Sequence, residues 1–248
     1  MKYNHGYTVC ISTQAGCKMG CGFCVTGKGG FSRNLSPAEM ILQIEAVGES
    51  KNIKISNVVL MGMGEPLDNY ENVLNFSRII THPKHLAIGA RHISVSTCGI
   101  VDKIYKLADL KPQFTLSVSL HAVDDETRNI LMKINKRWNI EALLEACKYY
   151  AEKTNRRISF EYAMIKGLND SLEDAKKLAS LLKDILCHVN LIPVNNSGNE
   201  NYRPSSRNTV TAFMNALQKS GVNATVRRTL GADINASCGQ LRANSKDT

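Results

Sequence analysis

The fold is decided by the stretch Cys17-Lys18-Met19-Gly20-Cys21-Gly22-Phe23-Cys24, in which three and then two residues separate the cysteines. Spacers this short keep three thiolates on one concave surface, where they can hold one face of an iron–sulfur cluster. Glycines in the loop allow tight turns and let backbone amides approach the cluster sulfurs. The ligands Cys17, Cys21 and Cys24 leave one iron of a four-iron cluster open, so the pattern predicts a cluster that binds substrate.

Other uses of these cysteines are less favoured. A zinc site normally closes with four Cys or His ligands, and the nearest further candidates, His5 and Cys10, lie in or beside a predicted strand. Buried thiols without a ligand fit a glycine-rich loop poorly. Disulfides are disfavoured because we find no signal peptide and expect a cytoplasmic protein, in which thiols stay reduced.

The composition favours a globular protein with a basic surface. Hydrophobic residues make up 43% of the 248 residues and charged residues 21%. No apolar run is long enough to span a membrane, so we expect no membrane contact. The formal net charge of +9 is compatible with a polyanionic partner, although a solvated basic surface is the commoner cause of such an excess.

Strand-like and helix-like patterns alternate along the whole chain. This predicts one α/β domain over 1–248, a parallel sheet curved into a partial barrel of six strand–helix units. A capping box at Ser36-Pro37-Ala38-Glu39 predicts the start of one helix, and Ser171 the start of another. The predicted strands cover residues 7–12, 57–61, 92–97, 114–119, 158–164 and 188–192.

Polar and glycine residues follow the predicted strands where ligands bind in such barrels, at the carboxyl ends. Each has a simpler explanation, because glycines after strands are usually turn formers and a histidine such as His121 is more often structural. Their convergence with the cysteine loop favours a common site. The candidates are Gly64, Glu65, Ser96, Ser119, Leu120, His121 and Asn195.

The spacing of Cys17, Cys21, Phe23 and Cys24 resembles the Cys-x3-Cys-x-aromatic-Cys signature of the radical S-adenosylmethionine superfamily. The resemblance implies a partial (βα)6 barrel and one 4Fe-4S cluster whose open iron binds the amino and carboxylate groups of S-adenosylmethionine. It further implies an electron donor such as flavodoxin or ferredoxin. Reduction of the cluster would then cleave the sulfonium and release a 5′-deoxyadenosyl radical.

Further segments resemble the RNA adenine methyltransferases of the RlmN and Cfr type over essentially the whole chain. The tail is the most specific of them, because other radical enzymes have no reason for a cysteine there. The segments are Thr8–Gln14, Met61–Leu67, Ser119–Ala122, Val226–Arg228 and Ala236–Leu241.

This family resemblance implies roles for two more cysteines. Cys238 would take a methyl group from one S-adenosylmethionine by nucleophilic displacement. A radical from a second molecule would remove a hydrogen from that methyl group, and the carbon radical would add to adenine. Cys10 would attack Cys238 to resolve the protein–RNA thioether and leave a disulfide. Carbon 2 of adenine is too electron-poor to attack a sulfonium methyl group, which explains the radical route. Because the two cysteines must also approach one another, we expect the tail to fold over the barrel mouth.

By the same resemblance, the strand-end candidates would contact S-adenosylmethionine, with Glu65 meeting its ammonium group. We interpret the remaining cysteines as small buried hydrophobes. These are Cys98, Cys147 and Cys187.

The implied partner is RNA, with 23S rRNA as the first candidate and transfer RNA as an open alternative or additional substrate, and the target base is expected to be flipped out of its stack. Family members typically carry an additional amino-terminal domain that grips RNA and supplies an acidic catalytic residue. We expect that domain to be absent, because the first predicted strand follows closely on Met1, and we expect a monomer. Candidate phosphate contacts, each also explicable as a solvated charge, are Lys28, Arg33, Arg227, Arg228 and Arg242.

Three alternatives stay open at this point. The enzyme could methylate carbon 8 of adenine with the same cysteines, although we favour carbon 2. It could catalyse another radical reaction, which would leave Cys10 and Cys238 without a role. It could also be an inactive RNA-binding fragment.

Overall fold

A curved sheet of eight strands runs through the residues that the computed structural model describes, which are 1–3, 6–194 and 202–227. The strand order is β1-β2-β5-β6-β7-β8-β9-β10, in which β1 is antiparallel to β2 and all other pairs are parallel. The strands are β1 (Lys2–Tyr3), β2 (Gly6–Cys10), β5 (Ile55–Leu60), β6 (Ile93–Thr97), β7 (Thr115–Ser119), β8 (Ile158–Met164), β9 (Cys187–Pro193) and β10 (Ala224–Val226). A separate antiparallel hairpin consists of β3 (Gln14–Gly16) and β4 (Phe31–Asn34).

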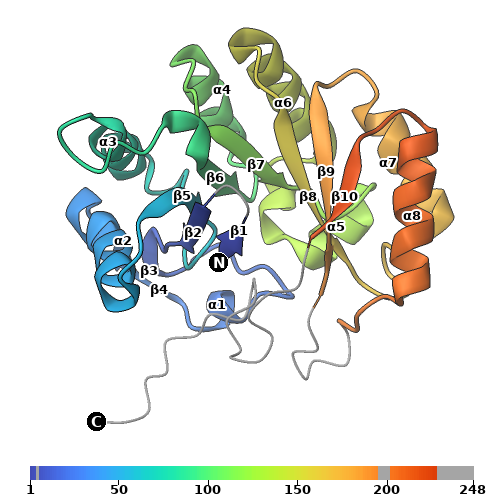
Figure 1. Cartoon of the computed structure of the whole chain (residues 1–248). Helices are drawn as coiled ribbons and strands as arrows, with labels where there is room; N and C mark the ends of the chain where they lie inside the picture. Colours follow the sequence, from blue (N-terminus) through green and yellow to red (C-terminus); the bar gives the residue numbers. More distant parts are fainter. Residues whose placement is uncertain (4–5, 195–201, 228–248) are drawn as a thin grey trace.

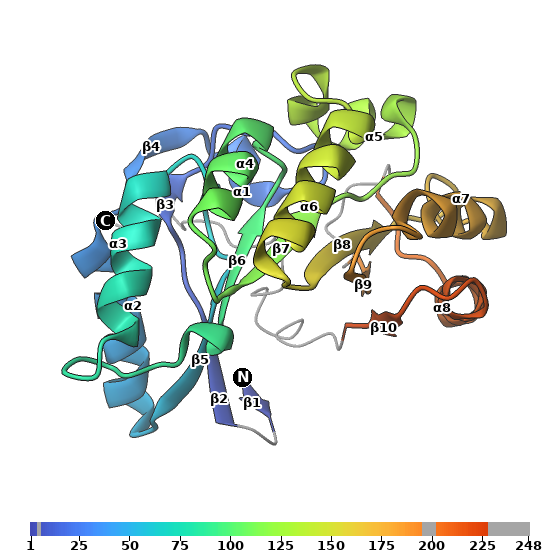
Figure 2. The same ribbon diagram turned by 90° about the horizontal axis from the view of Figure 1, so that it is seen from above.

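Six of the described helices cover the convex side of the sheet (Figures 1 and 2). None of the helices in the described part of the chain is long and apolar enough to cross a membrane. Those on the convex side are α2 (Pro37–Lys51), α3 (Tyr70–Thr81), α4 (Val101–Asp109), α6 (Ile140–Thr154), α7 (Leu172–Leu182) and α8 (Arg207–Lys219). Shorter helices are α1 (Val25–Lys28), α5 (Asp125–Leu131) and the 3-10 turns η1 (Ala90–His92) and η2 (Lys133–Lys136).

The two faces of the sheet differ in chemistry. Alternate strand residues such as Val58, Val95 and Val118 are fully buried in the core under the helices. Successive side chains alternate across a strand, so the residues next to the buried ones point to the other face of the sheet. Ser96 of β6 and Glu161 of β8 are two of them. The concave face is therefore polar, as a ligand-binding barrel requires.

The predicted partial barrel is confirmed, and each of the six predicted strands is present. The sequence analysis missed β1 and β10, which are too short to show a period, and placed the end of the first strand at Ser12 instead of Cys10. It also missed the β3–β4 hairpin and the short helical elements α5 and η2. These elements are short and polar, so hydrophobic periodicity does not detect them.

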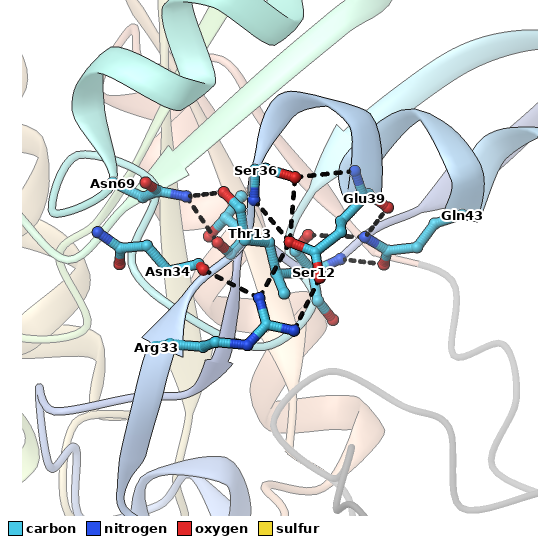
Figure 3. A network of polar contacts seen from close by, with 9 residues as sticks. Ser12, Thr13, Arg33, Asn34, Ser36, Glu39, Gln43 and Asn69 are labelled. Atoms are coloured by element: carbon cyan, nitrogen blue, oxygen red, sulfur yellow. Dashed lines mark hydrogen bonds and ion pairs between the residues drawn. The ribbon is translucent and has the colours of Figure 1, made fainter.

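The predicted capping box at the start of α2 is confirmed and belongs to a wider polar network (Figure 3). Ser36 Oγ accepts the backbone N–H of Glu39 at 3.3 Å, and the Glu39 carboxylate accepts the N–H of Ser36 at 2.9 Å. Arg33 from β4 donates to both oxygens of Glu39, at 3.0 and 2.7 Å. Gln43 exchanges two hydrogen bonds with the backbone of Ser12. The network joins α2 and β4 to the segment that leaves β2.

Replacing the cap residue should weaken the whole domain slightly. Ser36→Ala removes the acceptor for the Glu39 N–H and should lower the free energy of unfolding by ~1 kcal/mol, measured as a lower urea midpoint at unchanged m. Ser50→Ala is the matched control, because Ser50 Oγ donates to the Val47 carbonyl near the other end of α2 and caps no N–H group in the described part of the chain. Equal losses in the two variants would contradict the capping role.

Candidate functional site

The β3–β4 hairpin holds the cysteine loop. Residues 17–30 connect its two strands, and the N–H of Cys17 donates to the carbonyl of Gly30 at 2.8 Å. Gly16, at φ +82°, lies so close to this junction that a Cβ there would be 2.0 Å from the Gly30 oxygen. Only glycine permits that approach. The hairpin thus closes the loop at its base and presents the three cysteines together.

The far side of the loop rests on α5, on η2 and on the segment that follows β7. The N–H of Gly22 donates to the carbonyl of Leu131 at 2.9 Å, and a Cβ on Gly22 would lie 2.5 Å from the hydroxyl of Tyr202. The ring of Phe23 meets that of His121 edge to face, with centroids 5.0 Å apart. The aromatic residue of the cysteine motif therefore contacts a residue that the sequence placed at the same site.

The thiols of the loop share one environment. Burial, followed by the neighbouring Cys24 and Cys17, raises the pKa of Cys21 to about 12. Burial likewise raises the pKa of Cys17. Both groups thus favour the neutral thiol until a positively charged group displaces the protons.

This arrangement fits a cluster. Among the described residues, no three His, Cys, Asp or Glu side chains are placed to hold a single metal ion, as a zinc site would require. Cys17, Cys21 and Cys24 nonetheless influence one another electrostatically. A four-iron cluster binds each thiolate at a different iron, so it spreads its ligands more widely than one ion does. These three cysteines would hold it.

The turn after β5 is built around Gly64 and Glu65. Gly64 has φ +104°, and a Cβ there would be 2.6 Å from the Cβ of Gln14. The side-chain oxygen of Gln14 accepts the N–H of Glu65 at 2.9 Å. The carboxylate of Glu65, which is 3% exposed, accepts the N–H groups of Leu67 at 2.9 Å and Cys98 at 2.7 Å. Glu65 therefore ties the end of β5 to the end of β6; its contact with an ammonium group stays a prediction.

Ser96 and Ser119 lie at the ends of neighbouring strands. Ser96 is in β6 opposite Ser117 of β7, and Ser119 ends β7 opposite Glu161 of β8. Leu120 is fully buried, and its N–H donates to the carbonyl of Glu161 at 3.1 Å. The two serines are half-exposed on the polar face, so they are available to a ligand there, whereas Leu120 has no exposed side chain.

His121 is a satisfied, buried histidine. It has φ +59°, its Nδ1 accepts the N–H of Ala163 at 3.0 Å, and its carbonyl accepts from Asn169 at 2.7 Å. Burial, aided by the charge of Arg128, lowers its pKa from 6.5 to about 3. The ring is therefore neutral at physiological pH, and with Nδ1 as an acceptor its proton is on Nε2.

Glu161 was missed by the sequence analysis. It is 4% exposed, and its carboxylate accepts from Asn190 at 2.9 Å and from Ser159 at 3.2 Å. Burial raises its pKa, and the charge of Arg227 opposes that shift. The available signal was the alternation of polar and apolar residues in the strand Ile158–Met164, which places Ser159 and Glu161 on one face.

Several other predicted residues have different surroundings from those expected. Arg33, a candidate phosphate contact, is paired with Glu39, and Arg227 reaches the sulfur of Met61 at 3.8 Å. Cys98 and Cys147 are buried as expected, whereas Cys187 is only half-buried. Cys10 ends β2 and is half-buried. Outside the described residues lie Asn195, Arg228, Cys238, Arg242 and the side chain of Lys28.

Comparisons with known proteins match this geometry. Residues 11–182 fit the profile of the Radical SAM superfamily. A probable dual-specificity RNA methyltransferase RlmN of Clostridium tetani is 53% identical over 98% of this chain and 69% of its own length. The protein of the same name from Alkaliphilus oremlandii is 54% identical over 98% of this chain and 71% of its own.

A solved structure agrees with them. The crystal structure of a radical SAM methyltransferase from Sphaerobacter thermophilus superimposes on 98% of this chain and 72% of that one, with a TM-score of 0.93 and 43% identity. The chain belongs to the RlmN family of radical SAM methyltransferases. Membership of this family establishes a 4Fe-4S cluster and S-adenosylmethionine as its cofactors. The resemblance inferred from the cysteine motif is confirmed at the level of the family.

The close approach at Gly64 should make this position intolerant of any side chain. Gly64→Ala and Gly167→Ala both force alanine into a positive φ, at a cost of roughly 1–2 kcal/mol. Of the two, Gly64 also lacks room, whereas no atom of the described residues lies within 4 Å of a Cβ built on Gly167. Crowding against Gln14 should add roughly 1–3 kcal/mol. Equal urea midpoints for the two variants would show that crowding is unimportant.

The buried state of His121 predicts a pH dependence of stability. Its folded pKa lies below the unfolded value, so the unfolded chain binds the proton first as the pH falls below 6.5. Stability should decline from about pH 6.5 towards pH 3, by up to roughly 1.4 kcal/mol per pH unit.

His121→Asn tests this dependence. Asparagine keeps a short acceptor for Ala163 and tolerates a left-handed φ. Urea unfolding of both proteins at pH 7 and pH 5 should show a smaller loss for the variant. Identical losses would rule out His121 as the source.

Proposed function

We propose that the chain methylates carbon 2 of an adenosine in 23S rRNA, with transfer RNA as a second substrate, through a methylated cysteine. The observation that carries the proposal is family membership combined with a thiol, Cys10, at the end of the strand that leads into the cluster loop. The dual specificity in the names of the relatives supports two RNA substrates.

Each part of the site has a role in this reaction. The chemistry that the bound cluster supplies is one-electron reductive cleavage of S-adenosylmethionine. Cys238 accepts a methyl group through its sulfur, and Cys10 forms a disulfide with Cys238 when the product leaves. The polar concave face, with Ser96 and Ser119 beside the Gly64-Glu65 turn, binds S-adenosylmethionine between the cluster and the RNA. Asn195 and the main chain at Leu120 and His121 complete this binding site.

The proposal extends to the surroundings of the enzyme. It acts as a monomer in the cytoplasm, where a reducing environment keeps the thiols of the cluster loop available. A flavodoxin or a ferredoxin supplies the electrons. The reaction requires the tail that carries Cys238, which is outside the described residues, to bring its sulfur to Cys10 at the barrel mouth.

The function can be tested with protein reconstituted without oxygen. Dithionite, S-adenosylmethionine and a 23S rRNA fragment are added, and protein and RNA are analysed by mass spectrometry. We expect 2-methyladenosine in the RNA and a methyl group on Cys238. Transfer RNA is assayed in parallel.

Three cysteine variants divide the reaction. Cys238→Ala should abolish RNA methylation by at least 10³-fold while cleavage of S-adenosylmethionine continues, because this variant loses only the methyl acceptor. Cys10→Ala should accumulate a covalent protein–RNA adduct. Cys187→Ala, a half-buried thiol outside the site, is the control and should behave as wild type. Full RNA methylation by Cys238→Ala would refute the proposal, and 8-methyladenosine as the product would refute the choice of carbon 2.

A further inference from the structure

Arg128 is a charged side chain that the reaction described above does not use. It belongs to α5 and is fully buried, with an exposed fraction of 0%. Its guanidinium donates to the carbonyls of Leu120 at 3.1 Å, Cys98 at 2.9 Å and Ser119 at 3.2 Å, and to the side-chain oxygen of Asn135 at 2.8 Å. All three nitrogens of the guanidinium are therefore bonded.

Within the described part of the chain, the hydrogen bonds of Arg128 include no negatively charged partner. Every acceptor is a neutral carbonyl or amide oxygen, and the ion pairs found among the described residues do not include Arg128. A guanidinium without a counter-charge is costly to bury, because carbonyl dipoles replace only part of its hydration. A negative group close by in the functional state would remove that cost.

The backbone that Arg128 anchors also supports the cysteine loop. Leu131, at the end of the same helix, accepts the N–H of Gly22, and Lys133 of η2 lies against Gly20. The carbonyls that Arg128 holds end β6 and β7. One side chain thus fixes the support of the loop to the edge of the sheet.

The cysteine loop can supply such a negative group, because Gly22, whose N–H donates to Leu131 on the same helix as Arg128, stands between the ligands Cys21 and Cys24 in the chain. A four-iron cluster with three thiolates carries net negative charge, and one-electron reduction adds another. A fixed positive charge beside it favours the reduced state.

We propose that Arg128 is a positioning residue of the cluster site: it holds α5 and η2 beneath the cysteine loop, and its buried charge compensates the negative charge of the thiolate-bound cluster. This assignment rests on the cluster alone and does not depend on the RNA substrate.

Two substitutions separate the charge from the packing. Arg128→Lys keeps a positive charge with fewer donors, and Arg128→Gln keeps amide donors without the charge. Arg78→Gln is the matched control, because Arg78 is an exposed arginine on α3 whose guanidinium donates to Asn75 of its own helix. Iron content after anaerobic reconstitution and the cluster midpoint potential, followed by electron paramagnetic resonance, are measured for each.

In Arg128→Gln we expect the equilibrium constant for one-electron reduction of the cluster to fall at least tenfold, which lowers the midpoint potential by ~59 mV. We also expect this variant to retain less iron. Arg128→Lys should keep a potential near that of wild type, and so should Arg78→Gln. Failure of Arg128→Gln to fold, with Arg128→Lys folded and unshifted, would also support the need for a charge. A folded Arg128→Gln with the wild-type potential, or an equal shift in Arg128→Lys, would overturn the proposal. Failure of the wild type to bind iron would instead contradict the cluster assignment itself.

Discussion

The structure depends on how the backbone is satisfied where the parallel strands end. Past the last residue that pairs with a neighbouring strand, backbone N–H and carbonyl groups have no inter-strand hydrogen bonds. Here these groups are buried, so they need other partners. Cys98, just after β6, illustrates the solution: its N–H donates to Glu65 and its carbonyl accepts from Arg128. A buried carboxylate and a buried guanidinium are thus linked through one residue. Arg128 donates to neutral carbonyl and amide oxygens and Glu65 accepts backbone N–H groups, so each side chain is held by neutral dipoles.

The same device recurs along this edge. Asn169 accepts the N–H of Ile165 and donates to the carbonyls of His121 and Ala163. Gln14 accepts the N–H of Glu65 and donates to Asn34 and Asp68. Because each of these side chains joins segments far apart in the chain, the strand ends form a connected frame. The polar groups that face a ligand are therefore oriented before it arrives, which lowers the cost of binding.

Local patterns made the core of this site predictable. The cysteine spacing, the capping box and the apolar strands each depend on residues close in sequence, and the structure contains the expected elements. The partners of Arg128 and Glu65 are different, since each reaches Cys98 across 30 or more positions. Within Asp125-Glu126-Thr127-Arg128, an arginine looks like one more solvated charge of a polar segment. Its burial depends on the tertiary fold, which no local pattern records. His121 was expected at this site because it follows a strand. Its hydrogen bonds to Ala163 and Asn169, however, are those of a structural residue.

Burial of the cysteine loop has two consequences that pull in opposite directions. It raises the pKa of Cys21 and Cys17, so that without metal the loop holds neutral thiols and iron must displace their protons. The same burial excludes water and strengthens every electrostatic interaction once the thiolates have formed. Such a site needs a positively charged side chain that is not already paired with a carboxylate, because a paired cation could not compensate the charge of the cluster. Arginine satisfies this need better than lysine or histidine, because its guanidinium keeps its proton even when buried and offers enough donors to be fixed by carbonyls alone.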